Sequence, residues 1–158
     1  MLAQLLDSWA SLYANHAALR TAVEFAHIGG LTVGGGCAIT ADLATLTRGQ
    51  SDGAMRTSHV ALLRWTHLLV IAGLTGLFSS GLLLLAADVD TYWPSRLFWI
   101  KMALVLLLLV NGVFLRRSEQ RVGAGDPAAW PPLRRTATLS LALWSLTTLA
   151  GAALPNIG

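Results

Sequence analysis

The segment from Leu97 to Leu115 reads LFWIKMALVLLLLVNGVFL, and it decides the fold. Within it, Lys101 is the single charged side chain and Asn111 the single amide. About 20 apolar residues are needed to cross the hydrocarbon core of a bilayer. Backbone amides cannot stay unpaired there, so an apolar run of this length forms a helix rather than an isolated strand. The segment therefore predicts a transmembrane helix.

Three further apolar stretches accompany it, at residues 21–46, 60–87 and 137–154. The whole chain of 158 residues is 54% hydrophobic and 12% charged, whereas a soluble domain has about 25% charged residues. We therefore predict an all-α fold, an integral membrane four-helix bundle that occupies residues 20–158. Polar connecting segments are expected at residues 48–53, 88–90 and 123–132.

Residues 1–19 form a different kind of segment. Apolar and aromatic side chains recur there at helical spacing, with polar ones between them: Leu2, Leu5, Leu6, Trp9, Leu12 and Tyr13. This pattern is typical of an amphipathic helix that lies in the membrane interface, with its aromatic rings at headgroup depth. We predict a short interfacial helix; the alternative is a frayed N-terminal extension.

The basic side chains are divided unevenly between the two ends of the predicted bundle. Four spans place both termini and the 88–90 loop on one face, which has Arg20, Arg96 and Lys101. The other eight of the eleven basic residues belong to the opposite face: Arg48, Arg56, Arg64, Arg116, Arg117, Arg121, Arg134 and Arg135. Because cytoplasmic loops are rich in Lys and Arg, both termini are predicted on the periplasmic side of a bacterial inner membrane. The expected partner is the lipid bilayer and not a nucleic acid.

Polar side chains inside the spans are costly in lipid, so each indicates a function or a structural pairing. At 1.5 Å per residue, His27 and Lys101 reach a similar depth below the periplasmic face, with Glu24 one turn above His27. A second polar set is expected near the cytoplasmic face: Asp42, Arg64, His67 and Asn111. There we expect an ion pair between Asp42 and Arg64, because pairing lowers the cost of burying both charges.

Histidine suggests a cofactor, since b-type haems in helix bundles are held by neutral imidazoles. His27 is the first candidate ligand of a haem b iron and His67 the second, but they lie roughly 15 Å apart in depth on ideal helices. His27 would therefore pair with His16 or Met102, and His67 with a group from a partner chain or a nearby non-histidine group. Lys101 would neutralise a haem propionate or a quinone oxygen. The alternative is that each histidine bonds a backbone carbonyl or helps a proton path.

Glycines are concentrated in the first two spans. Gly30 and Gly34 have the GxxxG spacing that lets two helix backbones approach closely, and Gly73, Gly76 and Gly81 mark the second span. Close helix packing is the expected role. The same small residues are compatible with a flat cofactor beside them.

Short motifs in all four spans carry a family resemblance: Ala26–Gly30, Ala41–Leu43, Leu63–Thr66, Ser80–Leu83, Phe98–Met102 and Leu139–Trp144. Together they resemble a largely uncharacterised family of bacterial four-helix integral membrane proteins. More remotely, they are similar to the membrane domain of copper-resistance protein D-like proteins. The resemblance implies an inner-membrane bundle with His27, Asp42 and Lys101 at motif positions, but it implies no reaction. The chain departs from the copper-export branch, because it has three methionines and no Met-rich run.

These patterns predict a b-type haem electron-transfer protein or a subunit of a membrane redox complex, working as a homo-oligomer or beside a membrane redox partner. The alternatives are a non-catalytic structural or accessory subunit without a cofactor, and a metal or small-solute carrier. A single cysteine, Cys37, excludes an internal disulfide. No hydrolase triad, phosphate-binding glycine loop or metalloprotease histidine pair is present, so the sequence specifies no catalytic residue.

Overall fold

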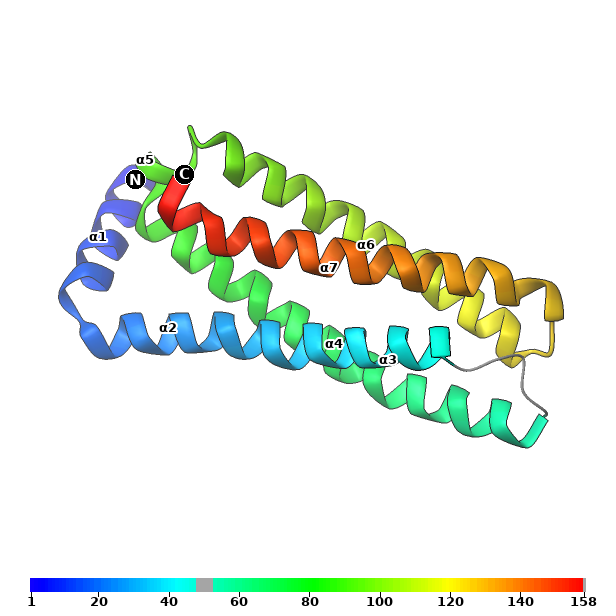
Figure 1. The fold of residues 1–158 in the computed structure, drawn as a ribbon. Coiled ribbons are helices and arrows are strands. Elements are labelled where there is room, and N and C mark those ends of the chain that lie inside the picture. Colours follow the sequence, from blue (N-terminus) through cyan, green and yellow to red (C-terminus); the bar gives the residue numbers. More distant parts are fainter. Residues whose placement is uncertain (48–52, 158) are drawn as a thin grey trace.

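The computed structural model describes residues 1–47 and 53–157, with the backbone alone at residues 2, 53–65 and 157. All described elements are helical (Figure 1). In chain order they are α1 (Leu2–Asn15), α2 (Ala17–Gly30), a π-helical segment (Leu31–Gly35), α3 (Gly36–Thr47), α4 (Gly53–Ala87), α5 (Val89–Tyr92), α6 (Arg96–Gly123), a 3₁₀ turn (Pro127–Ala129) and α7 (Trp130–Ile157).

Four helices are long and apolar enough to cross a membrane: Ala17–Thr47, Thr66–Ala87, Arg96–Gly123 and Pro127–Asn156. The helix that contains the first quoted segment continues two turns beyond Leu115. The last helix begins seven residues before the expected 137, so residues 130–132 of the expected loop are helical. Pro131 and Pro132 fit there because the first turn of a helix needs no backbone N–H donors.

Short polar side chains cap the start of α5 and of α6. The Asp88 carboxylate accepts from the Thr91 N–H at 3.3 Å and starts α5 inside the expected 88–90 loop. Ser95 accepts from the Phe98 N–H at 3.3 Å and starts α6. Such caps satisfy amide donors that have no partner in the first helical turn.

The seam between α2 and α4 is packed backbone to backbone. A methyl group added at Gly73 would lie 2.5 Å from the nitrogen and Cα of Gly34 and 2.8 Å from the Gly30 carbonyl oxygen. One residue on, Gly35 faces the Trp144 ring of α7, where an added methyl group would lie 3.3 Å away. The wide π-helical segment thus presents consecutive glycines to two different helices, and close packing is the role that these glycines have here.

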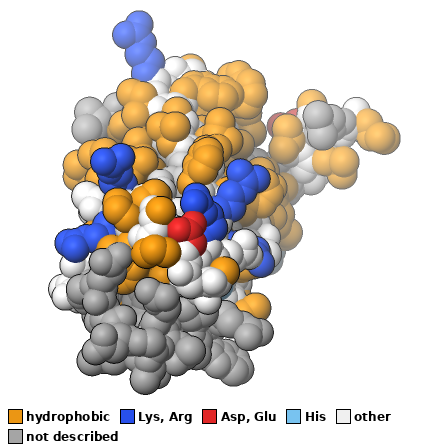
Figure 2. Space-filling model, turned by 90° about the vertical axis from the view of Figure 1, so that its right-hand side faces the viewer, with side chains coloured by type: hydrophobic (Ala, Val, Ile, Leu, Met, Phe, Trp, Pro, Cys, Tyr) orange, Lys and Arg blue, Asp and Glu red, His pale blue; other side chains and the backbone are white. Residues whose placement is uncertain are grey.

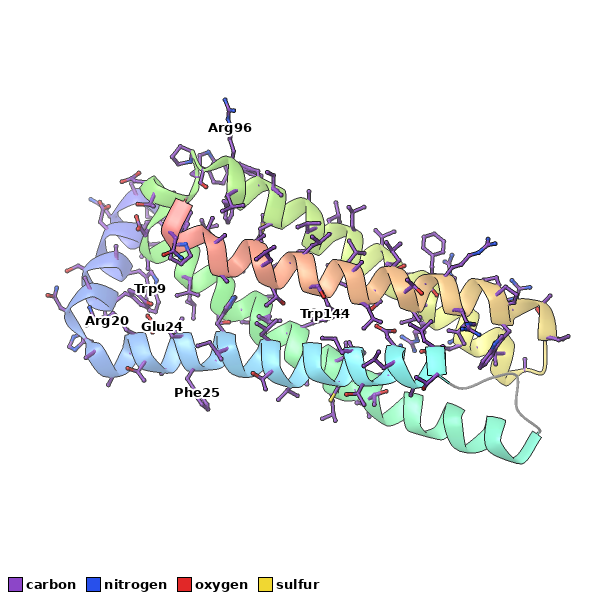
Figure 3. All side chains as sticks on the ribbon, viewed as in Figure 1. Trp9, Arg20, Glu24, Phe25, Arg96 and Trp144 are labelled. Atoms are coloured by element: carbon purple, nitrogen blue, oxygen red, sulfur yellow. The ribbon has the colours of Figure 1, made fainter. Side chains whose placement is uncertain are left out.

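The centre of the bundle is an apolar layer, which we call the Trp144 layer. Its members are Leu31, Ala38, Leu74, Leu77, Leu104, Leu108, Leu143 and Trp144. They come from every long helix, and Trp144 points inward at this level (Figure 3). Around this layer α2 packs along α4, whereas α3 and α6 pack along α7. As a result α2 and α7 diverge toward the end that carries α1 (Figure 1).

The outer surface of the bundle is apolar. Large hydrophobic side chains are widely exposed, among them Phe25 at 76%, Phe78 at 68%, Leu149 at 65% and Leu106 at 62%. Phe25 points away from the bundle (Figure 3). Single exposed leucines are ordinary on soluble proteins, but exposed apolar surface on this scale marks contact with lipid or with another protein.

Helix α1 turns back at His16 and crosses the end of the bundle (Figure 1). The Trp9 indole N–H donates to the Leu83 carbonyl at 2.9 Å, and the Tyr13 hydroxyl donates to Glu24 at 3.2 Å (Figure 3). Partial burial and the neighbouring Glu24 carboxylate raise the pKa of Tyr13. These contacts hold α1 against α2 and α4.

Candidate functional site

Four polar side chains lie one helical turn from the Trp144 layer, on the side of α1. One comes from each long helix, and we call them the His27 site: His27, Ser80, Lys101 and Thr147. His27 precedes Leu31 of the layer by four residues, and Lys101 precedes Leu104 by three. Ser80 and Thr147 follow layer residues at the same spacing on the antiparallel helices. Because three or four residues make one turn, the four side chains share one depth.

The hydrogen bonds of His27 assign its tautomer. The ring Nδ1 lies 3.0 Å from the Ser80 oxygen, and the Ser80 hydroxyl donates its proton to the Gly76 carbonyl at 2.6 Å. With the Ser80 hydroxyl used in this way, we assign Ser80 as the acceptor and the ring hydrogen to Nδ1. The Leu77 carbonyl also faces the ring as an acceptor. In this tautomer Nε2 keeps its lone pair, and no hydrogen bond to Nε2 is found among the described residues.

Lys101 and Thr147 are donors without an observed acceptor. The Lys101 ammonium lies over Gly151 of α7, 3.5 Å from where a methyl group there would be. It forms no salt bridge with any described side chain, and it interacts electrostatically with His27. Thr147, one turn from Gly151 on the same face, is 9% exposed, and its hydroxyl has no hydrogen-bond partner within the described residues.

A second polar group lies beyond the Trp144 layer, and we call it the Asp42 site: Asp42, His67, Glu119 and Ser140. Asp42 is 2% exposed and hydrogen-bonded by Ser140, and its Oδ2 has no partner among the described groups. His67 Nε2 lies 3.6 Å from a Glu119 carboxylate oxygen. Asp42 and Glu119 interact electrostatically, so two acidic groups from different helices share this end of the bundle.

The structure brings some of the expected residues together and separates others. His27 and Lys101 belong to one site, whereas Glu24 bonds to Tyr13 of α1. Asn111 donates to the Thr136 carbonyl at 3.0 Å and so joins α6 to α7. The expected Asp42–Arg64 ion pair lies outside the described side chains, because Arg64 is among those of which the backbone alone is described.

The histidines expected to bind a haem lie far apart along their helices. His16 caps the corner between α1 and α2, about 16 Å from His27 along α2 at 1.5 Å per residue. His67 lies about 20 Å along α4 from Ser80, which bonds His27. Met102 is half-buried beside Lys101 on α6. In the described part of the chain no three His, Cys, Asp or Glu side chains are placed to hold a metal ion.

Ser80, Thr147, Ser140 and Glu119 are site residues that the sequence alone did not single out. Comparison with family models, curated proteins and solved structures gives no match. The resemblance to copper-resistance protein D-like membrane domains therefore stays a prediction.

Proposed function

We propose that the chain is an integral protein of the bacterial inner membrane and an electron-transfer subunit of a membrane redox complex. Its redox group would bind at the His27 site. The observation that carries this proposal is the open Nε2 of His27. Ser80 holds the ring through its other nitrogen, and the Lys101 ammonium and the Thr147 hydroxyl lie at the same level of the bundle.

The membrane part of the proposal rests on the apolar surface. Side chains such as Phe25 and Leu149 remain exposed over the full length of the long helices, and water would oppose their exposure. Helix α1 crosses the bundle end at an angle to α2, which suits a helix lying in the interface.

The orientation rests on the arginines. Arg116, Arg117, Arg121, Arg134 and Arg135 gather where α6 meets α7, and Figure 2 shows basic side chains among hydrophobic ones at this end. The opposite end has Arg20 and Arg96 (Figure 3). The arginine-rich end would face the cytoplasm, and both termini the periplasm.

Cysteine labelling tests this topology. In a Cys37→Ser background, a membrane-impermeant maleimide added to intact spheroplasts is expected to label Asp90→Cys and not Ala124→Cys. After the membranes are opened, both positions should react. Labelling of Ala124→Cys from outside would reverse the orientation.

A b-type haem is the redox group that the sequence favours, and the hydrogen bond of His27 supports this residue as one ligand. A metal-binding imidazole usually donates its other N–H to a protein acceptor, as His27 does to Ser80. A second histidine at the same depth is not found among the described residues. Backbone contact at Gly30 and Gly73 also closes the α2–α4 seam to a flat group at that level. A haem would thus need Met102, or a ligand from a partner or a second copy.

A visible spectrum tests haem binding. Protein purified gently from cells supplied with haem precursor should show a Soret band that sharpens and shifts on dithionite reduction. His27→Ala should abolish the band, and His16→Ala, the control at the exposed corner, should retain it. A colourless wild-type protein from such cells would refute the haem form of the proposal.

An accessory subunit without a cofactor is the second reading, and one observation favours it. The His27–Ser80 bond also ties α2 to α4, which is a structural role that needs no ligand. A carrier is less compatible with the bundle, because the Trp144 layer lies between His27 and Asp42. These two residues are about 20 Å apart along the first span, which consists of α2, the π-helical segment and α3.

A further inference from the structure

We infer that the His27 site binds the ring of a quinol, the reduced dihydroxy-aromatic form of a membrane quinone. This inference rests on the proposed function, because it names the redox group of that same site. It is carried by the hydrogen-bonding groups that the bundle leaves without partners.

The three open groups differ in the hydrogen bonds that they can make. His27 Nε2 can only accept a hydrogen bond, since its ring proton is on Nδ1. The Lys101 ammonium can only donate, and the Thr147 hydroxyl, 9% exposed, has neither a donor nor an acceptor within the described residues. Of these, Thr147 is the buried group without a partner, and leaving such a group unsatisfied destabilises the folded state. A ligand that offers both a donor and acceptors would remove this cost.

A quinol ring has this combination. One ring hydroxyl would donate to His27 Nε2, and the hydroxyl at the other end of the ring would accept from Lys101 and donate to Thr147. The oxidised quinone has two carbonyl oxygens and no hydroxyl, so it could accept from Lys101 and Thr147 but would leave Nε2 without a donor. The site is therefore expected to prefer the reduced form.

Other ligand classes match less of the site. A carboxylate or phosphate would accept from Lys101 and Thr147, yet it brings no proton for His27. A metal ion at Nε2 would be repelled by Lys101, and no described acidic side chain completes its coordination.

The surroundings suit a ligand that arrives from lipid. His27 and Lys101 are half-buried, while the Trp144 layer lies directly beneath them with Leu31 and Leu104 one turn away. On this side of the layer α2 packs on α4 and diverges from α7 (Figures 1 and 3). The deeper side of the His27 site is therefore bordered by apolar side chains, which favours an apolar ring over a strongly hydrated ligand.

Binding of a short-tailed benzoquinol tests the inference. The full chain, purified free of endogenous quinone in nanodiscs, would be titrated with ubiquinol-1 under reducing conditions and with ubiquinone-1 under air, using equilibrium dialysis. We expect saturable binding with a tenfold or larger preference for the quinol. Thr147→Val and Lys101→Met, which keep the shape of each side chain, should weaken binding of both forms about tenfold, since one hydrogen bond is worth about 1.4 kcal/mol. His27→Phe should abolish the preference for the quinol.

The matched control is Thr148→Val, because Thr148 is an exposed threonine next to Thr147 on α7. It should bind like the wild type, and thermal unfolding of each variant would identify any that fails to fold. Absence of saturable binding to the wild type, or equal binding by the Thr147 and Thr148 variants, would overturn the inference. A haem spectrum that depends on His27, with no quinol binding, would refute the quinol while leaving the redox proposal standing. A colourless protein that binds no quinol would refute both.

Discussion

Replacing Gly73 with alanine should separate α2 from α4. The new methyl group would lie 2.5 Å from the nitrogen and Cα of Gly34, whereas ordinary contacts of this kind are 3.4–4 Å long. The blocking atoms belong to the backbone and cannot rotate away, so α4 must shift by about 1 Å at the seam. Overpacking of this kind costs about 1–3 kcal/mol, and alanine returns up to about 1 kcal/mol of helix propensity. We expect a net loss of about 1–2 kcal/mol.

Gly76 supplies the matched control, since it lies one turn away on the same helix. An added methyl group there meets nothing closer than 3.9 Å, so Gly76→Ala has the same propensity gain without the clash. Reversible unfolding of both variants in detergent micelles, followed by far-UV circular dichroism, would measure the difference. For a chain of this size, 1 kcal/mol shifts Tm by about 2–4 °C. We therefore expect Gly73→Ala to melt about 2–8 °C below the wild type and Gly76→Ala at or above it. Equal melting of the two variants would show that the seam is looser than the distances imply.

Three further predictions follow from contacts elsewhere in the bundle. The pKa of Asp126 is lowered by a hydrogen bond from Arg121 at 2.7 Å and by one from the Ala128 backbone N–H. The ionised carboxylate therefore stabilises the α6–α7 turn at pH values above the ordinary pKa of 3.8. This stabilisation is lost as the pH falls below that value and the carboxylate becomes protonated. Asp126→Asn should therefore unfold more easily than the wild type at pH 7, and this difference should shrink as the pH falls below 3.8. An equal difference at pH 7 and pH 2.5 would contradict the assignment. Trp144→Ala should destabilise the bundle by about 3–5 kcal/mol in denaturant titration, because it empties the central layer; a loss below 1 kcal/mol would show that the layer collapses around the gap. Trp9→Phe removes the hydrogen bond to Leu83, which is worth about 0.5–1.5 kcal/mol. Backbone hydrogen exchange should become faster in α1 and stay unchanged in α7. Unchanged exchange in α1 would mean that this bond does not hold α1 against the bundle.

The long helices were predictable because length and apolarity fix them without knowledge of their neighbours. The close approach at Gly30, Gly34 and Gly73 was also predictable in kind, since small residues at that spacing have few other uses in lipid. The start of α7 was not, because Pro131 and Pro132 occur in loops as well as in the first turn of a helix.

The missed site residues were hidden for two physical reasons. Glu119 stands among arginines, and a charged run ordinarily indicates a solvated loop. The signal that Glu119 faces the interior was its spacing from interior residues of the same helix. Leu115 lies four residues before it and Val122 three residues after it, and Asn111 lies one further turn before Leu115. Ser and Thr in apolar helices usually bond their own backbone, as exposed Thr138 does, so the sequence did not mark those that face the interior.

The π-helical segment determines the direction around the helix axis in which Asp42 points relative to His27. Successive residues of an α-helix are about 100° apart around its axis, and a π-helical segment accommodates one extra residue within an α-helix. If the same residues formed a plain α-helix throughout, the extra residue would turn α3 by about 100° relative to α2. His27 would keep its place against Ser80, while Asp42 would swing from the bundle interior toward its lipid-facing side. The segment therefore sets the angular phase between the two halves of the first span.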